Sequence, residues 1–98
     1  MIRVRPAHPG EAAAVTALAL RSKAHWGYDA AFMAAAATEL RWDEDDLRRM
    51  VVLVAERDGA LLGFAAVDPE ADPPALDALF VDPPAMGEGA GRRLLAAA

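Results

Sequence analysis

The clearest pattern in the chain is a pair of mostly apolar runs joined by the dipeptide Asp58-Gly59. VVLVAER occupies 51–57 and ALLGFAAVD occupies 60–68. Because Gly59 tolerates the positive φ of a tight primed turn, the pattern predicts an antiparallel hairpin. Each run is apolar at successive positions, so both faces of the hairpin are apolar. We therefore expect helices to cover it on both sides.

The segment before the hairpin changes from strand-like to helix-like periodicity. IRVR at 2–5 alternates apolar and charged residues, which predicts a short strand. From Pro9 the apolar residues recur at helical spacing and predict a first helix that ends near Lys23. Asp29 is a good N-cap, and the apolar stripe after it predicts a second helix that ends near Leu40.

The segment DEDDLRRM, at 43–50, places four acids before two arginines. This order complements a helix macrodipole and predicts a short third helix. A calcium loop is the alternative, but such a loop needs alternating oxygen ligands and a glycine at its sixth position, which this segment lacks. We therefore interpret the acids as a solvated helix start and expect no metal site.

After the hairpin, a loop at 69–74 leads to an apolar strand, ALDALFV, at 75–81. A glycine-rich loop then opens a final helix, GRRLLAAA, at 91–98. The order strand, two or three helices, three strands, helix predicts an α/β (α+β) fold. In this fold one mixed sheet carries helices packed on its faces.

Gly87, Gly89 and Gly91 stand at alternate positions between the last predicted strand and the last helix. Such a loop exposes unpaired backbone N–H groups at the positive end of the helix, which suits an anion. The glycines equally suit a chain that simply turns into a helix, and spacing alone leaves both interpretations open. A triphosphate loop or an NAD site is disfavoured, because no Gly-Lys-Ser/Thr is present and the glycines follow the last strand.

Composition limits the class of protein. The 98 residues are 55% hydrophobic and 26% charged, as expected for one small globular domain. The net charge of −5 disfavours nucleic acid as a partner, and the absence of cysteine excludes disulfides and thiolate zinc sites. The chain has no signal peptide pattern and no apolar run of the ~20 residues that cross a membrane. We therefore expect a cytoplasmic protein that does not bind membranes.

Three stretches together resemble the GNAT superfamily of N-acetyltransferases: VAERDGALLGFAAVD, LDALFVDPPAMGEGAGRRLL and, more loosely, RSKAHWGYDAAFM. The resemblance implies a single N-acetyltransferase-like domain over 1–98, with a GNAT-like, mostly antiparallel sheet flanked by helices. In the family a fifth strand and further elements follow the last helix predicted here. The chain is thus expected to hold only the N-terminal portion of the fold and to be C-terminally incomplete, whether as a natural short form, a truncation or a frameshifted product.

The family holds the pyrophosphate of acetyl-CoA, its cosubstrate, with the pattern Gln/Arg-x-x-Gly-x-Gly/Ala, which here falls on Met86, Gly89 and Gly91. Met86 replaces the usual Gln or Arg, and Glu88 adds a negative charge. By resemblance, the strand end pairs with the pantetheine arm and the loop N–H groups hold the pyrophosphate. The expected cofactor-binding residues are Phe80, Val81, Met86, Gly87, Glu88, Gly89, Ala90, Gly91 and Arg92.

Arg92 and its neighbour Arg93 start the final helix, where each fits a ligand contact or a solvated helix face. The family transfers the acetyl group directly to a primary amine. Asp77 is the candidate catalytic base, because it lies four residues before Val81 and, at the strand period of two, shares its face. An ordinary solvated strand residue is the alternative for this aspartate.

His25, Trp26 and Tyr28 lie between the first two helices, where the family commonly shapes its acceptor site. They are the expected substrate-binding residues, although each also fits a packing role. A rival interpretation is a non-catalytic acyl-CoA-binding or dimerising module derived from the same fold. The strand at 75–81 would keep an open edge, so we expect a homodimer with low or absent activity.

Overall fold

A four-stranded antiparallel sheet forms the centre of the molecule, with the strands in the order β1-β2-β3-β4. The computed structural model describes residues 2–73 and 75–97. The strands are β1 (Arg3–Pro6), β2 (Val51–Arg57), β3 (Ala60–Asp68) and β4 (Ala75–Val81). All four strands were predicted, and the pairing in the described part of the chain is entirely antiparallel rather than mixed.

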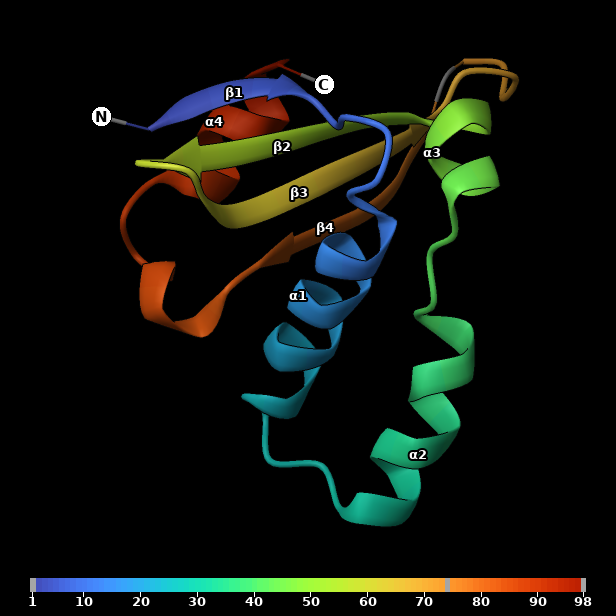
Figure 1. Cartoon of the computed structure of the whole chain (residues 1–98), viewed down its shortest axis with the longest axis vertical. Helices are drawn as coiled ribbons and strands as arrows, with labels where there is room; N and C mark the ends of the chain where they lie inside the picture. Colours follow the sequence, from blue (N-terminus) through green and yellow to red (C-terminus); the bar gives the residue numbers. More distant parts are fainter. Residues whose placement is uncertain (1, 74, 98) are drawn as a thin grey trace.

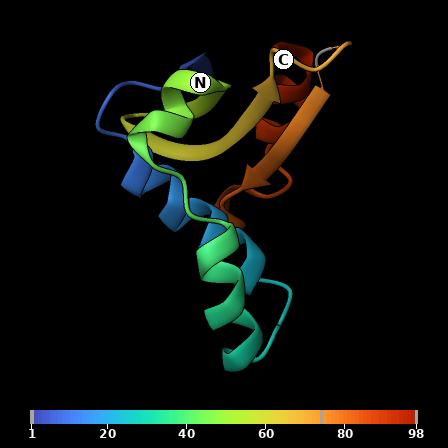
Figure 2. The same ribbon diagram turned by 90° about the vertical axis from the view of Figure 1, so that its right-hand side faces the viewer.

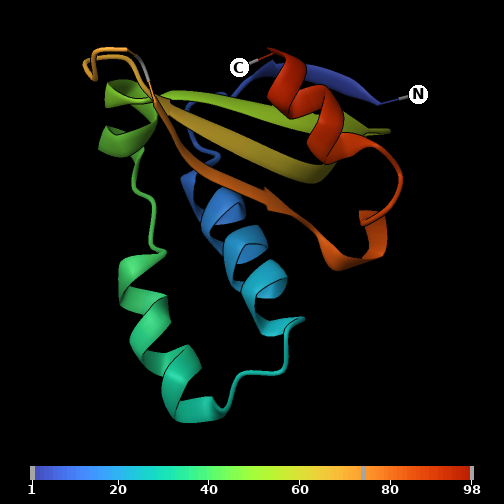
Figure 3. The ribbon, with the colours of Figure 1, turned by 180° about the vertical axis from the view of Figure 1, so that it is seen from behind.

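Helices lie on both faces of this sheet, as predicted. They are α1 (Ala12–Ala24), α2 (Ala30–Glu39), α3 (Glu44–Arg49) and α4 (Ala90–Ala97), together with the short 3-10 helix η1 (Pro83–Ala85), which was not predicted. α1 crosses one face of the sheet in Figure 1, and α4 crosses the other in Figure 3. α2 extends away from the sheet alongside α1 (Figure 2).

Two apolar cores fill the space between the sheet and these helices. On the α1 side the core consists of Val15, Leu18, Ala19, Val52, Val54, Phe64 and Ala66. On the α4 side it consists of Ile2, Ala55, Leu62, Ala65, Ala85, Ala90 and Leu94. Phe64 and Leu94 are fully buried, and each such side chain contributes about 1.5–3 kcal/mol to stability. The apolar runs of β2 and β3 thus serve both cores at once, which confirms the prediction that helices cover the hairpin on both sides.

The hairpin turn has the predicted conformation. Asp58 has φ +52° and Gly59 has φ +82°. Two consecutive positive φ angles define a type I′ turn, whose twist matches that of the strands it joins.

The acidic residues of the 43–50 segment serve as helix caps and ion-pair partners. Asp43 and Asp46 form a reciprocal capping box at the start of α3. The Glu44 carboxylate accepts from the backbone N–H groups of Gly10 (2.8 Å) and Ala12 (3.1 Å), so α3 closes the N-terminus of α1. No group of three or more potential metal ligands occurs within residues 2–73 and 75–97.

A second charged cluster ties the first strand to the first helix. The Arg5 guanidinium donates to both carboxylate oxygens of Glu11 at 2.9 Å, and the backbone N–H of His8 also donates to Glu11. The hydrogen bonds from Arg5 are the main reason that the pKa of Glu11 falls to about 2. Glu56 on β2 reaches Arg5 at 3.2 Å, so the network spans three elements.

β4 lies at an edge of the sheet, and no other strand of the described chain pairs with its outer side. Its inner side pairs with β3, from Val81 opposite Gly63 to Ala75 opposite Asp68. None of the helices in the part of the chain that the structure covers is long and apolar enough to cross a membrane.

Candidate functional site

The glycine-rich loop surrounds a cavity of about 320 Å³ at the C-terminal end of β4. Gly87 and Gly89 have φ +86° and +91°, which residues with a Cβ rarely adopt. The lining residues are Val81, Ala85, Met86, Gly87, Gly89, Ala90, Gly91 and Arg92. All the predicted cofactor residues except Phe80 and Glu88 therefore meet in one cavity.

Backbone N–H groups lie next to this cavity at the start of α4. The Gly89 carbonyl accepts from the N–H of Arg93 at 3.1 Å, which makes it the first acceptor of the helical ladder. The preceding N–H groups, of Ala90, Gly91 and Arg92, have no acceptor within the helix. They lie at the positive end of the helix dipole, so the cavity favours an anion.

Two glycines next to the cavity differ in the room that they leave for a side chain. A Cβ built on Gly91 would lie 3.5 Å from Cγ2 of Val81, an ordinary contact. A Cβ built on Gly63 of β3 would lie 2.8 Å from the carbonyl oxygen of Phe80, which is too close. Gly63 therefore lets β4 approach β3 where the cavity begins. Sequence reasoning missed this role, although a glycine inside a strand often marks close backbone approach.

The charged residues of the glycine loop and of the first turn of α4 differ in whether they line the cavity. Glu88 points its carboxylate to Arg57 at the end of β2, with 2.7 Å between Oε1 and Nη1. This hydrogen bond holds the pKa of Glu88 below its ordinary value. Arg93 donates to the backbone carbonyl of Ile2 at 2.9 Å, whereas Arg92 lines the cavity. Of the two arginines that were weighed as ligand contacts, only Arg92 is in position for one.

A second cavity, of about 460 Å³, adjoins the first and shares Val81 and Met86 with it. Its lining residues are Ser22, Lys23, Trp26, Tyr28, Leu79, Phe80, Val81 and Met86. It thus brings two of the three predicted substrate residues, Trp26 and Tyr28, to the end of β4. His25 is not in the lining; it ends α1 and packs edge-on against Trp26, with ring centroids 5.2 Å apart.

An ion pair joins the end of α1 to the residue that follows β4. The Arg21 guanidinium in the last turn of α1 donates to both carboxylate oxygens of Asp82, at 3.1 and 3.0 Å. The Asp82 N–H in turn donates to the Leu62 carbonyl at 2.8 Å. Because Arg21 and Asp82 are 61 residues apart, no local pattern in the sequence indicates this contact.

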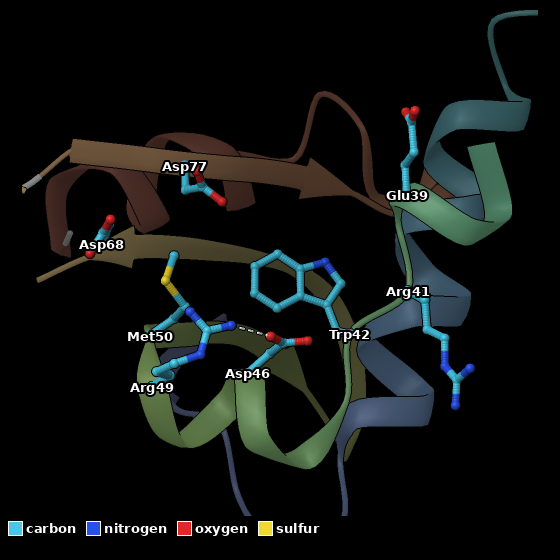
Figure 4. A pocket seen from close by; sticks show the side chains of 8 residues that line it. All are labelled: Glu39, Arg41, Trp42, Asp46, Arg49, Met50, Asp68 and Asp77. Carbon is cyan, nitrogen blue, oxygen red and sulfur yellow. Dashed lines mark hydrogen bonds and ion pairs between the residues drawn. The ribbon is translucent and has the colours of Figure 1, made fainter. Parts of the chain in front are cut away.

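A third cavity, of about 300 Å³, lies near the N-terminal end of β4. Its lining residues are Glu39, Arg41, Trp42, Asp46, Arg49, Met50, Asp68 and Asp77. In Figure 4 Asp68 and Asp77 lie near the Met50 side chain, which stands between Asp68 and the Trp42 ring, while Arg41 points away. This end of β4 is therefore lined mainly by charged side chains.

The predicted orientation of Asp77 was wrong. A bulge in β4 leaves this residue without a register partner, since Ala66 pairs with Ala78 but Val67 pairs with Leu76. The extra residue interrupts the alternation of faces on which the prediction rested. Val81 packs against the α4-side core, whereas Asp77 opens on the side where α1 and α3 lie.

Trp42 forms the wall of the third cavity, and its backbone is held in place from α1. The Thr16 hydroxyl accepts from the Trp42 N–H at 2.8 Å and donates to the Trp42 carbonyl at 3.0 Å. The indole ring meets Phe64 edge-on, with centroids 5.7 Å apart. Arg49 forms an ion pair with Asp46, and both residues also line this cavity.

The family model described as "Acetyltransferase (GNAT) domain" matches residues 48–98. Comparison with curated protein sequences gives no match. Among solved structures, the PaiA N-acetyltransferase from Thermoplasma acidophilum, in complex with coenzyme A, is similar with a TM-score of 0.84 at 18% identity.

Two further structures extend this likeness. A GCN5-related N-acetyltransferase from Rhodopseudomonas palustris has a TM-score of 0.75 at 26% identity. A GNAT family acetyltransferase from Brucella melitensis, in complex with acetyl-CoA, has a TM-score of 0.67 at 24% identity. The alignments cover 99%, 97% and 97% of this chain but only 69%, 61% and 64% of the three solved chains, in the order given.

Proposed function

The chain belongs to the GNAT acetyltransferase family, and from this premise we propose that it binds acetyl-CoA along β4 and transfers the acetyl group to a primary amine. The observation that carries the proposal is the glycine-loop cavity at the end of an unpaired strand edge. This cavity supplies an anion site, and the strand edge beside it supplies free backbone groups.

Three kinds of group would hold the cosubstrate. The N–H groups of Ala90, Gly91 and Arg92 suit the pyrophosphate, with the Arg92 guanidinium nearby. The outer edge of β4 at Phe80 and Val81 suits an extended chain with amide groups, because no strand within residues 2–73 and 75–97 pairs with the main-chain groups there. Met86 lines both neighbouring cavities, so it offers an apolar contact where the family usually has a polar side chain.

Bound acetyl-CoA supplies the thioester whose acyl group is transferred. Asp77 lies four residues before Val81, about 13 Å along an extended strand. The bulge leaves its backbone groups outside the regular ladder, available to polarise a carbonyl. Its carboxylate, in the charged third cavity, is our proposed acceptor of the ammonium proton. Asp68 adds a second negative charge that attracts a cationic amine.

Trp26 and Tyr28 are proposed to shape the approach of the acceptor from the α1–α2 connection. Both are exposed, at 68% and 43%, and both line the cavity that reaches Phe80. His25 is proposed to act only through its contact with Trp26, since it lies outside the lining.

A second candidate function is acyl-CoA binding without turnover, in a homodimer. The open outer side of β4 favours it, because an unpaired strand edge is a template for a second strand. A twofold contact between two β4 strands would cover the same edge on both copies. It would also compete with the pantetheine arm for that edge.

The test begins with coenzyme A and the purified chain. A ligand of the folded state raises the melting temperature by mass action, so we expect a concentration-dependent rise with coenzyme A. Turnover is then measured as thiol release with acetyl-CoA and a panel of amines, from amino acids to polyamines. A melting temperature that coenzyme A leaves unchanged contradicts the proposal. Binding without thiol release supports the second candidate.

Light scattering on the same samples distinguishes a monomer from a dimer. We expect a dimer without ligand if β4 pairs with a second copy, and dissociation as coenzyme A occupies the edge. A monomer at all concentrations removes the dimer from the proposal and leaves the acetyl-CoA site as stated.

A further inference from the structure

The Glu88 carboxylate is held outside the glycine-loop cavity. Glu88 lies between Gly87 and Gly89, both at positive φ, and its own N–H donates to the Ala85 carbonyl at 3.2 Å. The loop residues on either side of Glu88 line the cavity, but Glu88 itself does not. The loop therefore directs this one acidic side chain away from the N–H groups that suit an anion.

Arg57 forms an ion pair with the Glu88 carboxylate. Its guanidinium lies 2.7 Å from the Glu88 carboxylate, across 31 residues of sequence. Arg57 ends β2 directly before the type I′ turn, so its backbone position is fixed by the hairpin. The two side chains are 37% and 38% exposed, and exposed ion pairs contribute little to stability. The pair thus matters less for stability than for the position in which it holds the Glu88 carboxylate.

We infer that Arg57 is a positioning residue for the acetyl-CoA site: it holds Glu88 outside the glycine-loop cavity and neutralises it, which leaves the loop N–H groups to a pyrophosphate. This inference rests on the proposed function. Without Arg57, an ionised carboxylate is free beside the anionic pyrophosphate and repels it. The freed carboxylate is also an acceptor for the same N–H groups that the ligand needs.

The test is a double-mutant cycle read by calorimetry with coenzyme A. Arg57→Gln is expected to weaken binding about tenfold, the effect of one uncompensated charge at a partly exposed site. Glu88→Gln is expected to tighten binding about twofold, because it removes the negative charge and keeps the arginine. The double variant Arg57→Gln/Glu88→Gln is expected to return close to wild-type affinity.

The recovery in the double variant distinguishes positioning from direct contact. If Arg57 bound the ligand itself, the double variant would bind as weakly as Arg57→Gln, and the inference would be overturned. Arg57→Lys, which keeps the charge, should retain most of the affinity. Equal affinity of wild type and Arg57→Gln overturns the inference as well.

Two controls isolate the local effect. Arg48→Gln breaks an exposed ion pair with Asp45 in α3, far from the loop, and should leave the affinity for coenzyme A unchanged. Pantetheine, which lacks the pyrophosphate, should bind wild type and Arg57→Gln equally. The melting temperature of each variant shows that the fold is retained. A wild type that does not bind coenzyme A overturns the proposed function and this inference together, whereas binding that ignores Arg57 overturns the inference alone.

Discussion

The two ends of β4 are built in different ways. At its C-terminal end the cavity is bounded by backbone and small residues, where Gly87, Gly89 and Gly91 leave N–H groups accessible. At its N-terminal end the cavity is bounded mainly by larger side chains, among them the carboxylates of Asp68 and Asp77 and the Trp42 ring. The first end depends on conformation and the second on charge. Substitutions should therefore affect ligand binding at one end and turnover at the other.

The largest effect is expected from Gly89→Val. Gly89 has φ +91°, so a β-branched residue strains the loop and also crowds the cavity. We expect the affinity for coenzyme A, measured by calorimetry, to fall by at least about 100-fold.

Gly10→Val is the matched control for the loop variant. Gly10 has φ +92° and open space around it, but it lies just before α1 and outside the lining of the cavity. Both variants should lose about 1–2 kcal/mol of unfolding free energy, and only Gly89→Val should lose binding. An equal loss of affinity in both would show that the loop has no special role.

The next largest effect concerns the charged end. Asp77→Asn keeps the size of the side chain and removes its basicity, so we expect kcat to fall about 100-fold or more. Coenzyme A affinity should stay within about twofold, since the carboxylate lies outside the glycine-loop cavity. Asp68→Asn should mainly raise KM for the amine. A normal kcat in Asp77→Asn would remove this residue from the mechanism.

Acidification should lower the free energy of unfolding of the whole fold, which supports both ends of β4. The pKa of Glu11 is about 2 in the folded chain, lowered by Arg5 from an ordinary value of 4.5. Its contribution is fully present above pH of about 4.5 and is lost as the pH falls toward 2. We expect the unfolding free energy to drop by about 2 kcal/mol over that range, allowing for solvent screening.

The variant Glu11→Gln measures how much of the pH dependence of the unfolding free energy comes from Glu11. The variant should be about 2 kcal/mol less stable than wild type at neutral pH, and the difference should shrink toward pH 2. Urea denaturation at a series of pH values measures both curves. A constant difference would show that the ion pair with Arg5 does not control this transition.

The smallest effect is expected from Gly91→Ala, and its two readouts should have opposite signs. The added methyl would meet Val81 at 3.5 Å, an ordinary contact, so the helix should gain up to about 1 kcal/mol. The same methyl enters the cavity, so affinity for coenzyme A should fall about tenfold. Ala96→Gly, at the other end of α4, should lower stability without affecting affinity. Unchanged binding in Gly91→Ala would place the ligand elsewhere.

The difference between the two ends also explains what the sequence could predict. Glycines at alternate positions and the Asp58-Gly59 turn report local backbone conformation, which neighbouring residues largely determine. The hairpin, the helices and the position of the glycine-rich loop before α4 were therefore predicted. The same holds for Asp29, whose carboxylate caps α2 by accepting from the Phe32 N–H at 2.7 Å.

The remaining features depend on contacts between distant segments. The bulge that turns Asp77 toward α3 arises from the pairing of β3 with β4, which strand periodicity cannot reveal. Arg57 reaches Glu88 only after β2 and the glycine loop come together. Glu88 was expected among the cofactor-binding residues, and in the structure its side chain pairs with Arg57 and lies outside the lining of the cavity. Charge at a position is visible in sequence, whereas the direction of a side chain is not.

Trp42, whose ring packs edge-on against Phe64, can serve as a fluorescence reporter. The two tryptophans have different surroundings, because Trp26 is 68% exposed while Trp42 is partly buried and lines the charged cavity. With Trp26→Phe, the tryptophan fluorescence, excited selectively over Tyr28, comes from Trp42 alone. Its emission would then follow the entry of an acceptor into that cavity, without a label and without waiting for turnover.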